Sequence, residues 1–562
     1  MRLRQRRDKP EPAAGESGTD LLTIVRELLE GQQTPVVAIV DVAEEGADTG
    51  EAGVLTRELP TARISTYDAS VGLDELHVLL AAGGPFDLLL DLSSGKGSRR
   101  RFESLIFHAR AGGTLVTRLS EGDRRAPDDG LPGHLRSLET ARREEHLEEP
   151  TPGKDERTGK QRDRDALALS IEVLEITDEF AVVTNSVPTL AKIPEAAMNG
   201  FLRLRSSGDR VVDTVPAREW AVRCSVRASS DTYAATLPDT YQAPELSLRE
   251  YRDVTCMPRQ VAYKEGFVLP ESFRHNARKR LRNPKFAEWA PHFVRDPLAQ
   301  AVPVEGPLFY LDNHVRGHFG HTMTEQVSHL WGWRQAKERE PALRALVFLW
   351  GNKPMGEWEF ELFAAAGIER DDVVAVDHPL QVDRLITTSP MFSMPEFVHP
   401  DIQTTYDELG AALAARAGTR TWPDRVFCSR RIQKRWCHNT AEVEQLFADA
   451  GFEVIYPEDH PMADQAQFFR RARSIAGFAG SGMFQLSLAG GPKRVLLISS
   501  EGYTAQNEYM MSAVLGHRLD IALCRPDVPR EQGRFSVAWY QSDFTFDPDR
   551  EGVFVRDWLE DL

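Results

Sequence analysis

The sequence is poor in cysteine pairs, in long apolar runs and in positive charge, and each shortage narrows what the protein can be. Its five cysteines are scattered without a C-x-x-C pair, so neither a structural zinc site nor a disulfide framework is indicated. Reduced thiols of this kind fit a cytoplasmic location best. No apolar run approaches the roughly 20 residues that a membrane-spanning helix needs, so membrane contact is expected to be peripheral at most.

The charge balance is acidic, because 68 lysines and arginines stand against 85 aspartates and glutamates, which gives a net charge of −17. A general nucleic-acid binder would need a basic face, so no nucleic acid is expected as a partner. Residues 272–282 form a local basic cluster, which we interpret as a solvated helix face or a docking patch for an anionic acceptor. The Asp-x-Asp pattern at 163–165 lies in a charged stretch and is attributed to chance.

Two segments of biased composition divide the chain, whose 562 residues can bury several cores. Residues 1–19 begin basic but continue with Pro, Glu and Gly where a signal peptide needs an apolar segment, so a disordered tail is predicted. Residues 121–166 are dense in charged residues, Pro and Gly and poor in aromatics, which predicts a charged linker and a domain boundary.

Between these segments, residues 20–120 alternate helical and strand patterns, which predicts a small doubly wound α/β domain. The run 86–91 and the glycine pair 112–113 make this stretch resemble the Rossmann-like sheet of class I methyltransferases. A cofactor-binding version needs a glycine-rich turn after its first strand, whereas residues 43–48 carry carboxylates. We therefore expect a non-catalytic domain that does not bind S-adenosylmethionine, with methyltransferase activity as a weaker alternative.

The remainder of the chain predicts two further α/β domains. Residues 167–417 start with short strands and continue as a helix and strand alternation, which predicts a β-rich module leading into a first domain. Residues 418–562 alternate in the same way and predict a second domain, so the two should face each other across a cleft.

A group of cations follows a predicted strand that begins at Arg425. Arg430, Arg431, Lys434 and Arg435 would sit at the carboxyl end of that strand, the edge where open α/β sheets bind ligands. Guanidinium groups there can grip a diphosphate, and the following helix offers free N–H groups. The alternative is an ordinary helix start, with Asn439 as the cap, Glu442 as its N3 partner and the arginines solvated.

The second pattern with chemical content is the segment 321–325. If its helix begins before His321, the i and i+4 spacing puts His321 and Glu325 on one face, where they could deprotonate a hydroxyl group. If Thr322 is instead the N-cap, residues 322–325 form a capping box and Glu325 only ties down a backbone amide. His318 and His329 recur nearby, but Gly317 and Gly320 interrupt the pattern, so we predict no metal site.

Several elements in this order resemble glycosyltransferase family 61 over about residues 306–520. They are the H-x-x-x-E element at 321–325, S-R at 429–430 with R-x-x-x-N-x-x-E at 435–442, G-F-x-V at 451–454 and a Gly-rich turn at 477–482. Two departures stand out, because Ala479 replaces the family's turn histidine and Ile498-Ser499-Ser500 lacks its acidic residue.

The resemblance implies an inverting, metal-independent glycosyltransferase of GT-B architecture in polysaccharide or glycoconjugate synthesis. It would move a sugar from a nucleotide diphosphate sugar to a glycan or other hydroxyl acceptor, with no further cofactor. His321 or Glu325 would take the acceptor's proton. Donor binding would fall to six residues: Arg430, Arg435, Asn439, Gly480, Ser481 and Gly482. The alternative is a non-catalytic scaffold of the same fold, which the loss of the turn histidine favours.

Overall fold

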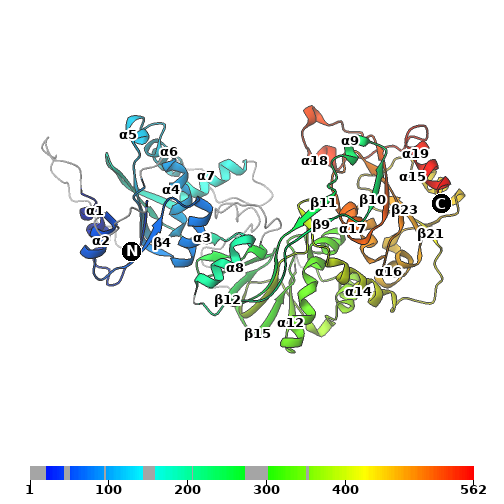
Figure 1. Cartoon of the computed structure of the whole chain (residues 1–562), viewed down its shortest axis with the longest axis horizontal. Helices are drawn as coiled ribbons and strands as arrows, with labels where there is room; N and C mark the ends of the chain where they lie inside the picture. Colours follow the sequence, from blue (N-terminus) through cyan, green and yellow to red (C-terminus); the bar gives the residue numbers. More distant parts are fainter. Residues whose placement is uncertain are drawn as a thin grey trace. The chain divides into compact units, whose positions relative to one another are not determined.

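The computed structural model describes residues 20–42, 51–93, 97–143, 158–205, 207–272, 301–349 and 353–562. The chain forms two compact units, one built mainly from residues 1–205 and the other mainly from 206–264 and 296–562 (Figure 1). The predicted tail at 1–19, the acidic turn at 43–48 and nearly all of the basic cluster at 272–282 lie outside the described residues. Within the described ranges, no helix combines the length and the apolar character needed to span a bilayer.

The first unit contains a six-stranded sheet in the order β2-β1-β3-β4-β6-β5. Its first four strands are parallel, and β6 runs antiparallel to both of its neighbours, β4 and β5. The strands are β1 (Val36–Asp41), β2 (Arg63–Asp68), β3 (Phe86–Asp91), β4 (Ala109–Arg118), β5 (Ile171–Ile176) and β6 (Phe180–Asn185). All six residues of β3 are buried, as a central parallel strand requires.

Both faces of this sheet carry helices, which agrees with the predicted α/β class. Val37 and Ile39 of β1 pack with α1 (Leu21–Leu28) and α2 (Glu51–Glu58), while Ala38 and Val40 pack with α3 (Leu73–Gly83) and α4 (Ser98–Leu105). Alternate residues of one strand therefore serve two separate cores. The unit is completed by η1 (Ile106–His108), β7 (Ala191–Lys192), α8 (Glu195–Leu204) and β14 (Phe267–Val268).

The prediction of a linker at 121–166 is wrong for its described part. Residues there form α5 (Glu121–Arg125), α6 (Leu131–Arg143) and the start of α7 (Gly159–Ser170). Leu131, Leu135 and Leu138 of α6 are buried in the same core as α3 and α4. Their spacing is that of an amphipathic helix, which the highly charged average composition concealed. The strands β5 and β6, expected in the β-rich module, also belong to this first unit.

The second unit contains two sheets. The first has the order β17-β16-β15-β18-β12-β13, with β8 paired to β12. Its strands are β8 (Arg210–Val215), β12 (Leu246–Met257), β13 (Val261–Lys264), β15 (Val302–Tyr310), β16 (Arg344–Phe348), β17 (Val373–Val376) and β18 (Leu380–Thr388). The strands from β15 onward are parallel to one another, and β12 runs antiparallel to β18.

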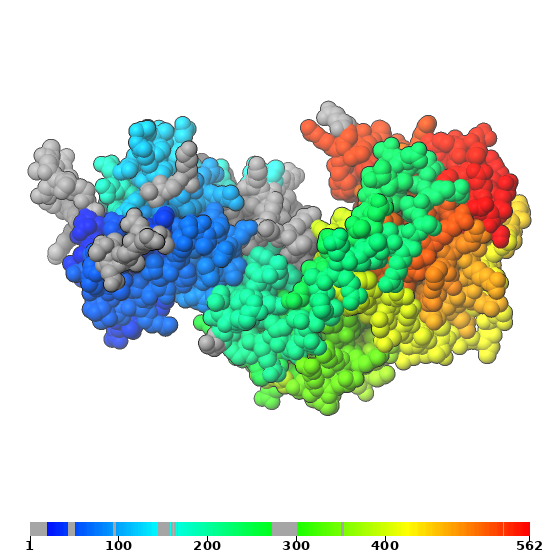
Figure 2. Space-filling model, viewed as in Figure 1, coloured from blue at the N-terminus to red at the C-terminus, as the bar shows by residue number. Residues whose placement is uncertain are grey.

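The second sheet is parallel throughout, in the order β10-β25-β24-β23-β21-β22. Its strands are β10 (Ser225–Ala228), β21 (Arg425–Cys428), β22 (Glu453–Ile455), β23 (Ser474–Phe478), β24 (Arg494–Ser500) and β25 (Arg518–Cys524). The edge strand β10 comes from the predicted β-rich module, far earlier in the chain. Figure 2 shows this green stretch against the orange surface of the later strands.

One hydrophobic core joins the two halves of the second unit, because Phe309 and Val347 of the first sheet belong to the same cluster as Val426 and Val495 of the second. The helices are α9 (Asp231–Ala234), α11 (Phe319–His321), α12 (Trp333–Arg339), α13 (Glu357–Ala365), α14 (Ile402–Ala414), α15 (Thr440–Asp449), α16 (Met462–Arg471), α17 (Asn507–Leu515), α18 (Val537–Tyr540) and α19 (Glu551–Glu560). Short paired strands complete the unit: β9 (Arg218–Ala221) with β11 (Thr240–Ala243), and β19 (Phe392–Ser393) with β20 (Phe397–Val398).

Candidate active site

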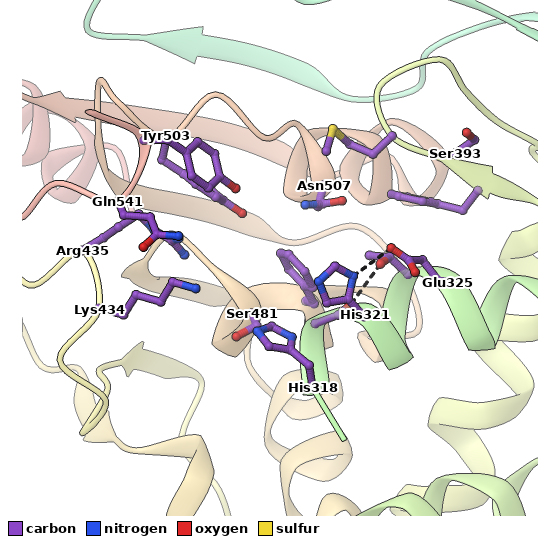
Figure 3. Close-up of a pocket in the computed structure, with 16 residues that line it drawn as sticks. His318, His321, Glu325, Ser393, Lys434, Arg435, Ser481, Tyr503, Asn507 and Gln541 are labelled. Carbon is purple, nitrogen blue, oxygen red and sulfur yellow. Dashed lines mark hydrogen bonds and ion pairs between the residues drawn. The ribbon is translucent and has the colours of Figure 1, made fainter. Parts of the chain in front are cut away.

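A cavity of about 360 Å³ lies within the second unit and is lined by elements from both of its halves (Figure 3). The lining residues are His318, Gly320, His321, Thr324, Glu325, Phe392, Ser393, Met394, Lys434, Arg435, Ser481, Phe484, Tyr503, Asn507, Tyr540 and Gln541. Four of the predicted site residues are among them, namely His321, Glu325, Arg435 and Ser481.

His321 and Glu325 form a hydrogen-bonded pair at the cavity wall. The short helix α11 continues directly into a π-helical turn, η4 (Thr322–Gln326), so both side chains project from one wall. Nδ1 of His321 lies 2.8 Å from Oε1 of Glu325. The other carboxylate oxygen accepts a hydrogen bond of 2.9 Å from the amide of Asn313. An ionised carboxylate only accepts, so Nδ1 carries the proton and Nε2 is the basic nitrogen.

The capping-box interpretation of this segment is wrong. Thr322 lies inside the helix, because its N–H donates to the carbonyl oxygen of His318 at 3.1 Å. Its hydroxyl group donates to Gln326 at 2.9 Å instead of capping an amide. The helix therefore begins before His321, which is the condition under which the two side chains were expected to share a face.

Gly320 brings the two halves of the unit close together beside this pair. A Cβ atom at Gly320 would lie 3.0 Å from Cβ of Ser481 and 3.1 Å from Cε2 of Phe484. Both residues belong to η8 (Ser481–Leu488), which follows β23 in the second sheet. The absence of a side chain thus allows α11 to approach the glycine-rich turn.

The four cations after β21 do not act as one group. Arg431 pairs with Asp459 at the surface. Arg430 is partly buried, and its Nη1 donates to the carbonyl oxygen of Lys434 at 3.1 Å. Burial and the neighbouring Arg435 lower the pKa of Arg430 to about 10, so it remains charged at neutral pH. Only Lys434 and Arg435 of the four line the cavity.

Arg435 is held by its backbone and by aromatic rings. Its φ of 52° lies in the left-handed region, which is uncommon for a residue with a side chain. Its guanidinium group lies 4.4 Å from the ring centre of Tyr503 and 5.6 Å from that of Tyr540. Its buried Nε has no hydrogen-bond partner in the described part of the chain.

Asn439 was predicted to bind the nucleotide sugar, but the structure gives its side chain another role. Its Nδ2 donates to the carbonyl oxygen of Phe546 at 2.9 Å, and its Oδ1 accepts from the N–H of Phe546 at 3.0 Å. Nδ2 also lies 3.0 Å from a carboxylate oxygen of Glu442. Asn439 therefore fastens the C-terminal segment to the start of α15 and does not line the cavity.

The backbone of the glycine turn is hydrogen-bonded to the buried carboxyl group of Glu508. The N–H of Gly480 donates to Oε1 of Glu508 at 2.7 Å, so this amide is not directed at a ligand as predicted. Burial raises the pKa of Glu508 to about 7. Gly480 has a φ of 139°, and a Cβ atom there would lie 3.1 Å from Nη2 of Arg435. Ser481 lines the cavity, whereas Gly480 and Gly482 do not.

Sequence reasoning missed most of the supporting residues. Asn313 and Glu508 belong to no motif, because the hydrogen bond that links each to the site joins it to a residue distant in the sequence. Tyr503 and Tyr540 are far from the arginine segment in sequence, and nothing in their local pattern indicates that they contact Arg435. The sequence pattern suggests for His318 only membership of a metal site, which Gly317 and Gly320 argue against.

The possible metal site is not assembled in the described ranges, where no group of three or more His, Cys, Asp or Glu side chains is placed to hold an ion. His329 points elsewhere, because its Nδ1 lies 2.7 Å from the carbonyl oxygen of Thr388. All five cysteines are free thiols.

The second unit therefore combines two open α/β sheets with a cavity at their strand ends. Two cations and a histidine–carboxylate pair line that cavity. Residues 319–496 match the model of the family described as Glycosyltransferase 61, so the predicted resemblance is confirmed for this segment. The match supports glycosyltransferase activity in general for the part of the chain that contains this segment.

Other comparisons add little. No curated protein matches the chain. One similar solved structure is the MycE methyltransferase from the mycinamycin biosynthetic pathway, in complex with Mg and SAH. It is 20% identical, covers 28% of this chain and has a TM-score of 0.20. The chain spans 42% of the length of that structure, and a likeness at this level carries no argument about function.

Proposed function

We propose that the second unit is an inverting, metal-independent glycosyltransferase with the GT-B arrangement, which transfers a sugar from a nucleotide diphosphate sugar to a hydroxyl acceptor. The observation that carries the proposal is one cavity that holds the His321–Glu325 pair together with Lys434 and Arg435. The base can take the proton that the acceptor hydroxyl loses. The two cations can stabilise the negative charge that develops on the leaving diphosphate.

In this reaction, Nε2 of His321 takes the proton of the acceptor hydroxyl as its oxygen bonds to the anomeric carbon. The bond from that carbon to the diphosphate oxygen breaks, and its electron pair leaves with the diphosphate. Glu325, 2.8 Å from Nδ1, stabilises the imidazolium that forms. General base catalysis of this kind contributes about 10²–10⁴ in rate.

Arg435 and Lys434 stabilise the departing diphosphate. Arg435 lines the cavity, and a guanidinium group can donate two parallel hydrogen bonds to phosphate oxygens. Preorganised charges at a leaving group are worth several kcal/mol, about 3 or 4 for a single donor. Arg430 does not line the cavity and instead supports the loop through its hydrogen bond to the carbonyl oxygen of Lys434.

A scaffold protein of the same fold is the second candidate. Two observations favour it: Ala479 offers no polar side chain at the turn, and the N–H of Gly480 is engaged by Glu508. The five free thiols support the proposal of a cytoplasmic location for either protein. A role in polysaccharide or glycoconjugate synthesis is part of both proposals.

Binding of UDP, GDP, ADP and CDP, measured by calorimetry with and without EDTA, tests the proposal. We expect at least one of them to bind in both conditions and Arg435→Ala to weaken it by about 10- to 100-fold. Arg431→Ala is the matched control, because this neighbour pairs with Asp459 outside the cavity. Binding that persists in Arg435→Ala would contradict the assigned site, and binding without turnover on any nucleotide sugar would favour the scaffold.

A further inference from the structure

His318 occupies a position in the cavity that the proposed reaction does not yet use. It precedes α11 as its N-cap residue, and its carbonyl oxygen accepts the N–H of Thr322. Much of the residue's surface is exposed and the rest lines the cavity, so it lies where the cavity opens to solvent. In Figure 3 its ring lies beside Ser481 and on the same side of the cavity as Lys434.

The approach of His318 to the glycine turn follows from Gly320. A Cβ atom at Gly320 would lie 3.3 Å from Cε1 of His318 and 3.0 Å from Cβ of Ser481. The imidazole and Ser481 therefore meet over the same small residue. At this turn Ala479 supplies no polar side chain, so His318 from the other half of the unit places a titratable ring there.

The charges around His318 are arranged for an anion. Lys434 comes from the loop after β21, Arg435 lines the same cavity, and His321 and Glu325 come from the wall that follows His318. Among the described lining residues, Glu325 is the single carboxylate, and His321 already pairs with it. Partial burial lowers the pKa of His318, with His321 and Lys434 acting in the same direction and Glu325 opposing them.

We infer that His318 binds a phosphate oxygen of the donor's diphosphate and takes up a proton when that group enters the cavity. The inference rests on the proposed function. The neutral ring can donate one N–H to a phosphate oxygen, and the entering negative charge then favours the second proton. On transfer, the protonated ring adds positive charge beside Lys434 where the leaving diphosphate becomes more negative.

Binding of the diphosphate should be coupled to uptake of a proton by His318, and a residue with only a structural role would not show this coupling. The free ring has a pKa below its usual value of 6.5. The negative charge of a phosphate beside it would raise that pKa. Between the two values, binding takes up a proton, so affinity increases as the pH falls through that range. His321 has its own partner in Glu325 and is present in every variant compared.

Calorimetry on the full chain, with whichever of UDP, GDP, ADP and CDP binds most tightly, tests this at pH 7 in buffers of low and high ionisation heat. We expect wild type to take up more protons than His318→Gln, by up to about one per site. We also expect His318→Gln to bind about 10- to 100-fold more weakly at pH 6, with a smaller loss at pH 8. His378→Gln is the control, because His378 is a surface histidine beside Asp377.

His318→Asn serves as the second variant, since Asn keeps a good N-cap at α11 if His318→Gln does not fold. Equal proton uptake in wild type and variant, or equal affinity at pH 6, would overturn the role of His318. If Arg435→Ala loses binding in the same series, the proposed function survives that failure. If none of the nucleoside diphosphates binds wild type, the proposed function fails and this inference fails with it.

Discussion

His321 and Glu325 have different roles in the proposed base. Nε2 of His321 accepts the proton, while Glu325 accepts the hydrogen bond from Nδ1 and so orients the ring. Glu325→Gln keeps an oxygen that can accept the N–H of His321 but removes the negative charge that stabilises the imidazolium. We expect turnover to fall by up to about 10⁴-fold, as when the carboxylate beside a catalytic histidine is replaced by an amide, with little change in melting temperature. Loss of activity in proportion to a lowered melting temperature would instead assign the pair to folding, and His321→Ala provides the comparison.

Asn313 is predicted to matter through Glu325 alone. It is buried, its Oδ1 accepts the N–H of Val315 at 2.7 Å and its Nδ2 donates to Glu325. Asn313→Asp keeps the first bond and replaces the second by repulsion between carboxylates. We expect turnover to decrease with a raised apparent pKa of the base in the pH–rate profile. An unchanged profile with lowered stability would show that Asn313 only supports the loop.

At the level of elements, the meeting of α11 with η8 depends on Gly320. Adding one methyl group there forces Ser481 and Phe484 to move, since the contacts of 3.0 and 3.1 Å are too short. We expect Gly320→Ala to weaken nucleoside diphosphate binding and Gly320→Val to abolish it. Gly482→Ala is the control in the same turn, because a Cβ atom there meets nothing within 4 Å. Equal effects of Gly320→Ala and Gly482→Ala would show that the approach is unimportant.

The start of α17 carries a pH dependence of stability through Glu508. Its folded pKa is raised to about 7, so between the unfolded value of 4.5 and pH 7 the folded state retains a proton that the unfolded state has lost. Stability therefore decreases as pH rises through this window, by about 3 kcal/mol in total. Glu508→Gln keeps an acceptor for Gly480 and removes this loss.

We expect the melting temperature of Glu508→Gln to exceed that of wild type above pH 7 and to converge with it near pH 4.5. Thermal melts across this range measure the difference. Glu560→Gln is the control, because Glu560 is exposed near the C-terminus. A parallel shift at every pH would mean that the amide changes packing and that ionisation of Glu508 is not involved.

For the whole molecule, the sequence predicted the parts that repeat a local pattern and missed those made by distant contacts. Three patterns are local in the sequence: the α/β alternation, the i and i+4 pair and the cation cluster. The structure contains α/β sheets, a hydrogen bond between His321 and Glu325, and two of the cations at the cavity. The edge strand β10 pairs with a strand almost 300 residues later, between Ser225 and Arg518, and no local pattern encodes that pairing. In α6, charged residues between the leucines concealed a core helix.

The same limit explains the site residues. Arg430 and Arg435 are equivalent in the sequence, yet φ of 52° at Arg435 and the rings of Tyr503 and Tyr540 place only Arg435 at the cavity. Asn439 reads as a binding residue or a cap, and its partner Phe546 lies more than 100 residues away. A motif locates a loop, and tertiary contacts decide which of its side chains face the ligand.

The division into two compact units predicts two separable responses to ligands. In the first unit, Arg101 pairs with Asp91 at 3.0 Å at the carboxyl end of β3, the edge where a cofactor would bind in such a sheet. We therefore expect S-adenosylmethionine to shift no melting transition of the full chain. A nucleoside diphosphate at 100 times its dissociation constant should stabilise the second unit by about 2.7 kcal/mol.

Core variants identify which transition belongs to which unit. Leu115→Ala removes a buried side chain from the first unit and Leu497→Ala one from the second, at a cost of about 2–5 kcal/mol each. Calorimetric melts of the full chain should show the nucleoside diphosphate raising only the transition that Leu497→Ala lowers. If the nucleotide raised the transition lowered by Leu115→Ala, the ligand site would belong to the first unit. A shift with S-adenosylmethionine would restore the methyltransferase alternative, because the Arg101–Asp91 pair would then have to open for the cofactor.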